Sequence, residues 1–173
     1  MKNIQKIALW GSVAALAVVM ASCGAAQKAA DKDTAQWRYE IEPVGVGAQG
    51  TYLIKVWSYS KKTVVAMEQA KKNAVHGIIF KGFTGGSGLT SQKPMAPNAN
   101  VFEEHKDYFE SFFANGGKYM QFVNISNSGA IAAGDRVKVG KEYKVGVVVS
   151  VNKDALRKEL ENAGIIQKLG GIF

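Results

Sequence analysis

The chain has 173 residues, a length typical of a single domain. Lys and Arg total 22 against 14 Asp and Glu, so the formal net charge is +8, while 47% apolar and 21% charged residues match an ordinary globular protein. One cysteine excludes an internal disulfide and a cysteine-cluster zinc or iron–sulfur site. Two histidines without an HExxH pair argue against a histidine-based metal site. We therefore expect neither a metal nor a cofactor.

The first 22 residues differ in composition from the rest of the chain. Lys2 and Lys6 form a short positive region, and an apolar stretch of 14 residues follows from Ile7 to Met20. That stretch is shorter than the roughly 18–20 residues that a membrane-spanning helix needs. A charged start, a short apolar centre and small residues before a cut are typical of a secretory signal peptide. Residues 1–22 are therefore predicted to be removed, the alternative being an anchor that stays attached.

The end of this segment indicates the kind of signal. The sequence Met20-Ala21-Ser22-Cys23 resembles the lipobox of bacterial lipoproteins, although Met20 departs from the commoner Leu at its position. The resemblance implies that Cys23 is acylated on its thiol and, after the cut, on its new amino group. Two or more acyl chains hold a protein stably on a bilayer. With Gly24 rather than Asp after the cysteine, the resemblance also implies a place at the outer membrane, facing the periplasm. The alternative is a chance cysteine after an ordinary signal.

Residues 23–36 are small and polar with no apolar face, which predicts a flexible tether between the lipid and the domain. An alanine-rich helix is the alternative. Within the tether, Asp33-Thr34-Ala35 is similar to an O-glycosylation acceptor pattern of some bacterial envelope proteins. The similarity makes Thr34 a candidate for O-glycosylation.

The domain, residues 37–173, opens with two expected strands. Alternating apolar and polar side chains predict the first over 37–47, until Pro43 and several glycines break the pattern. The segment 51–59 is β-branched and aromatic and is bounded by turn residues, so it predicts the clearest strand of the chain.

A strand–helix–strand unit is expected to follow from the second strand. An apolar stripe at helical spacing predicts a helix over 63–75, and Gly77 stands where a C-cap glycine belongs. The apolar run 78–83 then predicts a buried strand. The whole unit, 51–83, has the length of a right-handed βαβ crossover, so we expect its two strands to be parallel.

A long glycine-rich loop is expected over 82–99. Loops of more than about 12–15 residues are uncommon in compact domains and are often functional or mobile. The loop is therefore a candidate binding loop, through Gly82, Gly85, Gly86 and Gly88. A phosphate cradle is the less favoured interpretation, because no Gly-Lys-Ser/Thr step is present and the next helix begins some twelve residues later.

The second half of the domain begins with an aromatic helix over 101–115. Its apolar face is formed by Phe102, His105, Phe109, Phe112 and Phe113. A strand over 118–126, an antiparallel hairpin over 136–151 and a helix over 153–162 complete the predicted elements.

Neither histidine is predicted to be catalytic. His105 lies on an aromatic face, where a lone histidine is usually a half-buried packing residue. His76 lies at the expected end of a helix, where it would complement the helix dipole. No partner group for a catalytic histidine can be identified, and neither a Gly-x-Ser-x-Gly elbow nor a Ser-x-x-Lys motif is present. The sequence therefore predicts a protein that is not an enzyme.

These elements predict an α+β fold, with a single mixed β-sheet, about three helices packed mainly on one face, and a βαβ unit. The leading function is a lipid-anchored cell-envelope protein that acts as a binding or assembly factor, with an envelope protein as partner. It would use the loop 82–100 or an open sheet edge. One alternative is a glycan- or peptidoglycan-binding module that stacks sugars on Trp57 and Tyr59, and another is an envelope hydrolase with an unrecognised site.

In an exported protein the positive charge is not expected to bind nucleic acid. Anionic lipid headgroups or an acidic envelope polymer are the more plausible partners in that compartment. A surface whose charge serves solubility alone is the simpler interpretation and the one that the composition favours.

Overall fold

The computed structural model describes residues 28–30, 32, 37–126 and 131–168. The segment predicted to be a signal peptide (1–22), the predicted acylation site Cys23 and the candidate glycosylation site Thr34 lie outside these residues. Of the predicted tether, residues 28–30 and 32 are described; they are helical and Ala30 is buried, in agreement with the high helix propensity of alanine. No helix in the described part of the chain is long and apolar enough to cross a membrane.

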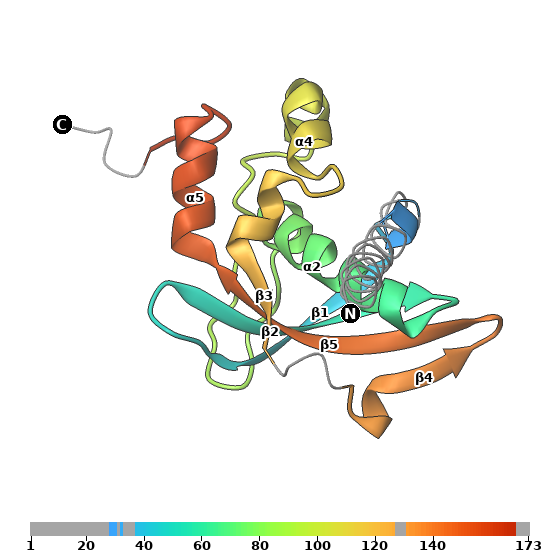
Figure 1. Ribbon diagram of the computed structural model, residues 1–173. Coiled ribbons are helices and arrows are strands. Elements are labelled where there is room, and N and C mark those ends of the chain that lie inside the picture. Colours follow the sequence, from blue (N-terminus) through green and yellow to red (C-terminus); the bar gives the residue numbers. More distant parts are fainter. Residues whose placement is uncertain (1–27, 31, 33–36, 127–130, 169–173) are drawn as a thin grey trace, which may run out of the picture.

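The five strands of the described chain form one antiparallel sheet (Figure 1). Strand β1 (Tyr39–Val46) pairs with β2 (Thr51–Ser60), which pairs along its whole length with β5 (Glu142–Asn152). Strands β3 (Val123–Ile125) and β4 (Arg136–Val139) both pair with the other edge of β5. The sheet therefore ends at β1 on one side and at the short β3 and β4 on the other.

Helix α2 (Thr63–Phe80) lies against one face of this sheet and is buried on most of its surface. Twelve of its 18 residues are buried, which marks it as a core helix rather than a surface helix. Ala66, Ala70 and Ala74 recur at every fourth position and are fully buried. Such small side chains allow close packing of a helix against its neighbours.

Four further helical segments lie on the same side of the sheet as α2 (Figure 1). They are α3 (Val101–Glu104), α4 (Lys106–Phe112), the 3₁₀ helix η1 (Lys118–Phe122) and α5 (Lys153–Asn162). Their buried aromatic residues are Phe109, Phe112, Phe113, Tyr119 and Phe122. The predicted α+β domain, with helices packed mainly on one face of one sheet, is thus confirmed.

The expected βαβ unit is wrong. Residues 78–80 continue helix α2, no strand forms over 78–83, and the sheet is antiparallel throughout rather than mixed. The last turn of α2 is buried on most sides, and its sequence is therefore an unbroken run of apolar residues. Hydrophobic periodicity alone cannot distinguish such a run from a buried strand. Gly77 lies inside the helix and does not cap it. A Cβ at this position would lie 2.1 Å from Cδ1 of Ile41 in β1, so the glycine permits close contact with the sheet.

Two other predicted elements differ in the structure. The aromatic helix is divided at His105, whose φ of −120° and ψ of 39° separate α3 from α4. The segment 118–126 forms the 3₁₀ helix η1 before the short strand β3. Tyr119 and Phe122 are both buried, and their spacing of three residues places them on one side of a 3₁₀ helix.

The remaining predicted elements are confirmed with small shifts of their ends. The strands expected over 37–47 and 51–59 are β1 and β2, and the hairpin is β4–β5, entered through the 3₁₀ turn η2 (Ala133–Asp135). The last helix is α5, where Oδ1 of Asn152 accepts a hydrogen bond of 3.0 Å from the backbone N–H of Ala155. This contact satisfies one of the free N–H groups of the first turn.

Candidate functional site

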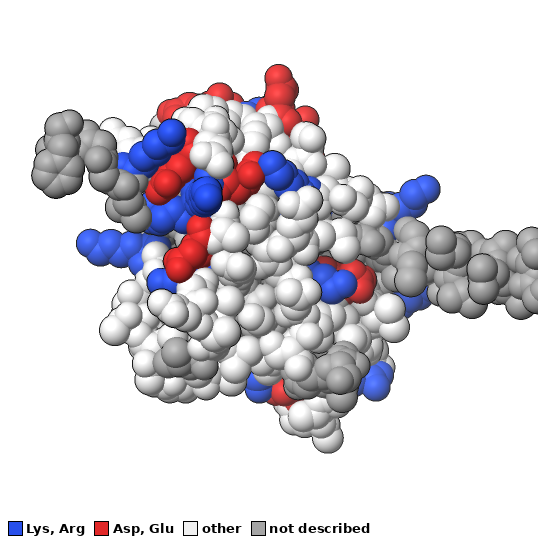
Figure 2. Space-filling view, turned by 60° about the vertical axis from the view of Figure 1, so that its left-hand side comes forward, with Lys and Arg blue, Asp and Glu red and all other residues white. Residues whose placement is uncertain are grey.

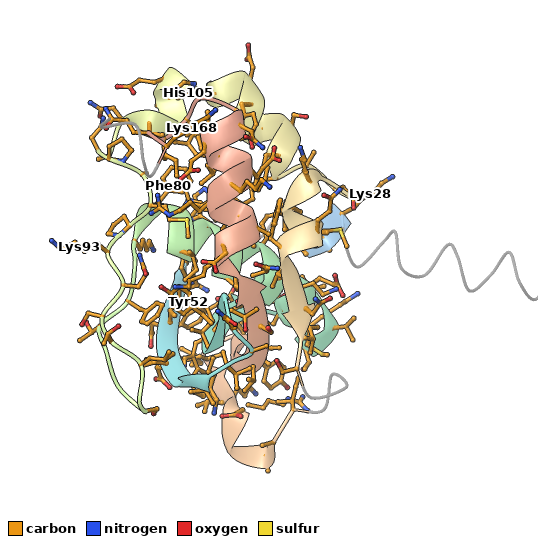
Figure 3. The ribbon with its side chains drawn as sticks, turned by 90° about the vertical axis from the view of Figure 1, so that its left-hand side faces the viewer. Lys28, Tyr52, Phe80, Lys93, His105 and Lys168 are labelled. Atoms are coloured by element: carbon orange, nitrogen blue, oxygen red, sulfur yellow. The ribbon has the colours of Figure 1, made fainter. Side chains whose placement is uncertain are left out.

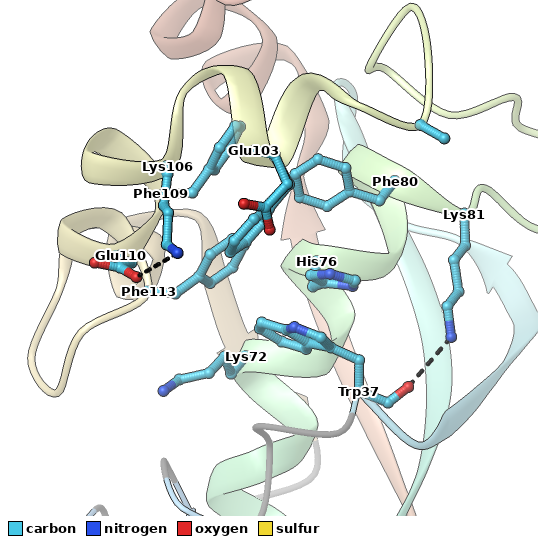
Figure 4. Close-up of a pocket in the computed structure, with 12 residues that line it drawn as sticks. Trp37, Lys72, His76, Phe80, Lys81, Glu103, Lys106, Phe109, Glu110 and Phe113 are labelled. Atoms are coloured by element: carbon cyan, nitrogen blue, oxygen red, sulfur yellow. Dashed lines mark hydrogen bonds and ion pairs between the residues drawn. The ribbon is translucent and has the colours of Figure 1, made fainter.

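An open cavity of about 800 Å³ lies between helix α2, the α3–α4 pair and Trp37, just before β1 (Figure 4). Its aromatic walls are formed by Trp37, His76, Phe80, Phe102, Phe109 and Phe113. Its charged side chains are those of Lys72, Lys81, Glu103, Lys106 and Glu110. A volume of this order accommodates a small organic ligand or the apolar side chains of a partner.

Trp37 and His76 form one wall of this cavity by stacking on each other. Their ring centroids are 3.7 Å apart and their planes differ by 14°. The backbone of Trp37 has a φ of +46°, a left-handed conformation that costs a bulky residue about 1–3 kcal/mol and persists only where the surroundings hold it. Lys81 supplies one such contact, since its Nζ donates to the carbonyl oxygen of Trp37 at 3.3 Å. The stacking and this hydrogen bond therefore keep the indole against the cavity.

His76 is neutral in the folded protein. Its Nδ1 shares a hydrogen bond of 2.5 Å with the hydroxyl of Tyr39 in β1. Burial, with a smaller contribution from the charge of Lys81, lowers the pKa of His76 to about 3. The expectation that His76 complements the end of a helix dipole is therefore wrong, because the residue lies inside α2 and carries no charge at neutral pH.

Two lysines of the cavity, Lys72 and Lys81, lie against aromatic rings. Nζ of Lys72 is 5.6 Å from the ring centre of Tyr119, and Nζ of Lys81 is 4.0 Å from that of Tyr39. Burial lowers the pKa of Lys72 to about 8, and it also lowers the pKa of Lys81.

Both signs of charge are present at the rim of the cavity. Figure 4 shows the Glu103 carboxylate directed into the cavity and Lys106 turned toward Glu110, whose Oε1 is 4.0 Å from Nζ of Lys106. An apolar interior with both signs of charge at its rim suits an amphipathic ligand or peptide segment.

The predicted glycine loop forms a hairpin. Phe83 pairs with Gln92, and Gly86 pairs with Leu89 through two backbone hydrogen bonds of 3.0 and 2.9 Å. The N–H of Gly85 donates to a side chain of the same loop. These N–H groups are used within the loop, which agrees with the preference for a loop over a phosphate cradle.

The glycines of this loop have clear backbone roles. Gly82 and Gly88 have φ values of +68° and +82°, and a Cβ at Gly82 would lie 2.0 Å from the carbonyl oxygen of Gln92. The loop contains one charged residue, Lys93, which points away from the molecule in Figure 3.

The predicted site residues do not meet in the aromatic cavity. Gly82, Gly85, Gly86 and Gly88 are not among its lining residues, and His105 lies between α3 and α4, outside the lining. The sequence pattern did predict the aromatic face of 101–115, which supplies Phe102, Phe109 and Phe113. The pattern gave no signal that Trp37 and α2 would complete the cavity, because those segments are distant in the sequence.

A second surface is the face of the sheet that points away from α2. Trp57 and Tyr59 lie on this face, and a Cβ at Gly146 would lie 3.0 Å from the Trp57 ring. Glu40 accepts hydrogen bonds of 2.6 Å from Lys144 and 2.9 Å from Tyr59, which lower the pKa of its carboxyl. Nε1 of Trp57 is buried and has no hydrogen-bond partner among the described residues. The face thus combines aromatic rings with hydrogen-bonding groups.

Within the described ranges, no group of three or more His, Cys, Asp and Glu residues is placed to hold a metal ion. Comparison of the chain with family models, with curated proteins and with solved structures gives no match. The function must therefore be argued from the geometry of the two surfaces.

Neutral burial of His76 predicts a loss of stability in mild acid. The unfolded chain binds a proton at His76 near pH 6.5, whereas the folded chain does so only near pH 3. Stability is therefore unaffected by this group above pH 6.5 and falls as the pH drops below it. From pH 7 to pH 5 the contribution is about 2 kcal/mol. Urea unfolding of wild type and His76→Gln should differ in pH dependence by this amount. His105 is present in both proteins, so parallel pH profiles would contradict the neutral burial of His76.

Gly82→Ala is expected to destabilise the fold by about 2 kcal/mol or more, because the left-handed backbone disfavours a Cβ and the new atom meets a carbonyl oxygen. Thermal denaturation measures the change. Gly134→Ala is the control, since a Cβ there would have no atom within 4 Å. An unchanged melting temperature for Gly82→Ala would show that the loop does not depend on this glycine for its conformation.

Proposed function

We propose that this protein is lipid-anchored in the cell envelope, at the outer membrane facing the periplasm, and acts there as a binding or assembly factor. The charged, apolar and lipobox-like segments that end at Cys23 support the anchor. The aromatic cavity between α2 and α3–α4 is the observation that carries the binding function. Its occupant would be an apolar or amphipathic segment of an envelope partner.

The chemistry of the cavity supports binding over hydrolysis. Among the described residues that line it there is no Ser, Thr or Cys that could act as a hydroxyl or thiol nucleophile. His76 has a pKa of about 3, so it is a poor general base at neutral pH. An envelope hydrolase that uses a hydroxyl or thiol nucleophile, one form of the alternative function, therefore gains no support from the described lining.

The walls of the cavity are held in place before any ligand arrives. Phe102 and Phe109 stack at 5.4 Å, and Phe80 contacts Phe109 edge-on at 5.0 Å. Trp37 meets the edge of Phe113 at 5.3 Å. Because the rings support one another, little side-chain freedom remains to be lost on binding, which favours affinity.

Photo-cross-linking in living cells tests the cavity as a partner site. A photoreactive phenylalanine analogue in place of Phe102, at the cavity wall, is expected to form one dominant protein adduct. Phe80→Asp in the same chain should abolish that adduct, because a carboxylate in the aromatic wall would have to be desolvated.

The same analogue in place of Val44, which is 38% exposed and outside the cavity, is the matched control. Equal yields of the same adduct from both positions, or an adduct that survives Phe80→Asp, would contradict the cavity as the contact site.

A glycan- or peptidoglycan-binding module is the second candidate function, and the outer sheet face supports it. Trp57 and Tyr59 lie there beside Glu40 and Lys144, a combination of ring surface and hydrogen-bonding groups that suits a sugar. Nε1 of Trp57 finds no hydrogen-bond partner in the described part of the chain, and a shift of the ring would expose this N–H donor to a sugar hydroxyl.

Tryptophan fluorescence distinguishes the two surfaces. After removal of residues 1–22 the chain keeps Trp37 in the cavity and Trp57 on the sheet face. If the sheet face binds glycans, soluble muropeptides should change the emission of a Trp37→Phe variant, which reports Trp57 alone. They should leave a Trp57→Phe variant unchanged. A response confined to Trp37 would reject the sheet face and favour the cavity.

A further inference from the structure

Four lysines gather at one end of the sheet. They are Lys61, Lys62, Lys138 and Lys141, all of them exposed. The first two follow the last residue of β2, and the others lie in the β4–β5 hairpin. Ser60 pairs with Tyr143, and Tyr143 pairs with Lys138, so these segments lie about two strand spacings apart, roughly 10 Å. Figure 1 shows the start of α2 and the tip of the hairpin on the same side of the molecule.

The positive charge at this end is not neutralised locally. Within the part of the chain that the structure describes, none of the four lysines forms an ion pair. Glu142, the acid beside the hairpin turn, pairs with Arg38 instead. Four exposed cations therefore remain available to an anionic surface.

Exposed valines lie among these lysines. Val64 in the first turn of α2 is 60% exposed, and Val137 and Val139 in β4 are each 47% exposed. They are three of the four large apolar residues found exposed in the described chain. The fourth, Val44, lies toward the opposite end of β1. Apolar side chains among cations are typical of surfaces that rest in the headgroup region of a bilayer.

The chain enters the domain at this same end of the sheet. Tyr39, the first residue of β1, pairs with Ser58, two residues before the end of β2. The steps from Cys23 to Trp37 number 14, so this length spans at most about 50 Å. A lipid on Cys23 would therefore keep the lysine-rich end within reach of the bilayer.

We propose that this end of the domain, formed by the β2–α2 turn and the β4–β5 hairpin, docks on a bilayer surface that carries anionic lipid headgroups. The four lysines contact the phosphate groups, and the exposed valines enter the interface between headgroups and acyl chains. The β1–β2 turn, at the other end of the sheet, then points away from the membrane. The inference rests on the proposed lipid anchor, which would supply the bilayer.

The test uses the full chain, processed in a lipoprotein-processing bacterium and reconstituted into phosphatidylcholine vesicles with or without phosphatidylglycerol. An environment-sensitive thiol dye is attached in Val64→Cys and Val139→Cys variants, and Val44→Cys is the control. We expect blue-shifted emission at positions 64 and 139 only with phosphatidylglycerol, and its reversal in high salt. The same emission at all three positions, or no dependence on lipid charge, would overturn the docking surface.

A matched pair of charge reversals tests the role of the lysines. Lys61→Glu with Lys62→Glu should abolish the blue shift of the dye at position 139. Lys93→Glu with Lys158→Glu makes the same change of net charge at exposed sites outside this end and should leave the shift intact. Equal loss in both pairs would show that only the net charge of the protein matters, which would overturn a localised docking end.

The unmodified wild type separates failure of docking from failure of the anchor. Cys23 is its only cysteine, so absence of dye labelling means that the thiol is blocked, as acylation requires. Labelling of wild type would refute the anchor. In that case, loss of binding to added phosphatidylglycerol vesicles on Lys61→Glu with Lys62→Glu would still support the docking end. Unchanged binding would overturn it.

Discussion

Helix α2 is buried on most of its surface, and the sheet and the other helices must pack around it. A helix in this position must pair most of the polar groups that it carries inward. Nδ2 of Asn73 donates to Oγ of Ser58 at 2.9 Å, and His76 is hydrogen-bonded to Tyr39. Removing one partner of such a pair leaves a buried polar group unsatisfied, which costs about 1–3 kcal/mol. These two bonds therefore fix the rotation of α2 over β1 and β2 and present His76 to the cavity.

This same burial explains which parts of the fold were predictable. Strands β1 and β2, the β4–β5 hairpin and α5 have one exposed face or a recognisable cap, so their periodicity or turn residues reveal them. Helix α2 loses its periodicity toward its end, where Ile78 and Ile79 are both fully buried. Gly77 then resembled a cap, although its lack of a side chain permits contact with Ile41. Hydrophobic periodicity in the sequence reveals an element that is buried on one side only. It does not reveal the type of an element that tertiary packing covers on every side.

The candidate site was predictable only in part. The aromatic spacing in 101–115 predicted a face that packs, and that face does supply one wall of the cavity. The other walls come from Trp37 and α2, and no spacing within a sequence encodes a contact between segments so far apart. The glycines of the 82–99 loop were a weaker guide. Positive φ values and close backbone contacts require glycine in a tight hairpin as well as in a phosphate-binding loop. A glycine-rich segment therefore indicates an unusual backbone conformation and does not by itself indicate a ligand.

The positions of the charged residues (Figure 2 shows those of one face) show where on the domain the excess of lysine and arginine over acids is found. On the outer sheet face the charges are paired, as in Lys144 with Glu40 and Lys55 with Asp135, and paired surface charges add little to the long-range field. The surplus of cations is therefore felt where lysines form no ion pair with an acid of the described chain, as at the β2–α2 turn and the β4–β5 hairpin. Solubility alone would account for exposed lysines but not for Val64 and Val139 among them, because exposed apolar side chains oppose solubility. A surface that is both cationic and apolar is what the proposed contact with a bilayer requires.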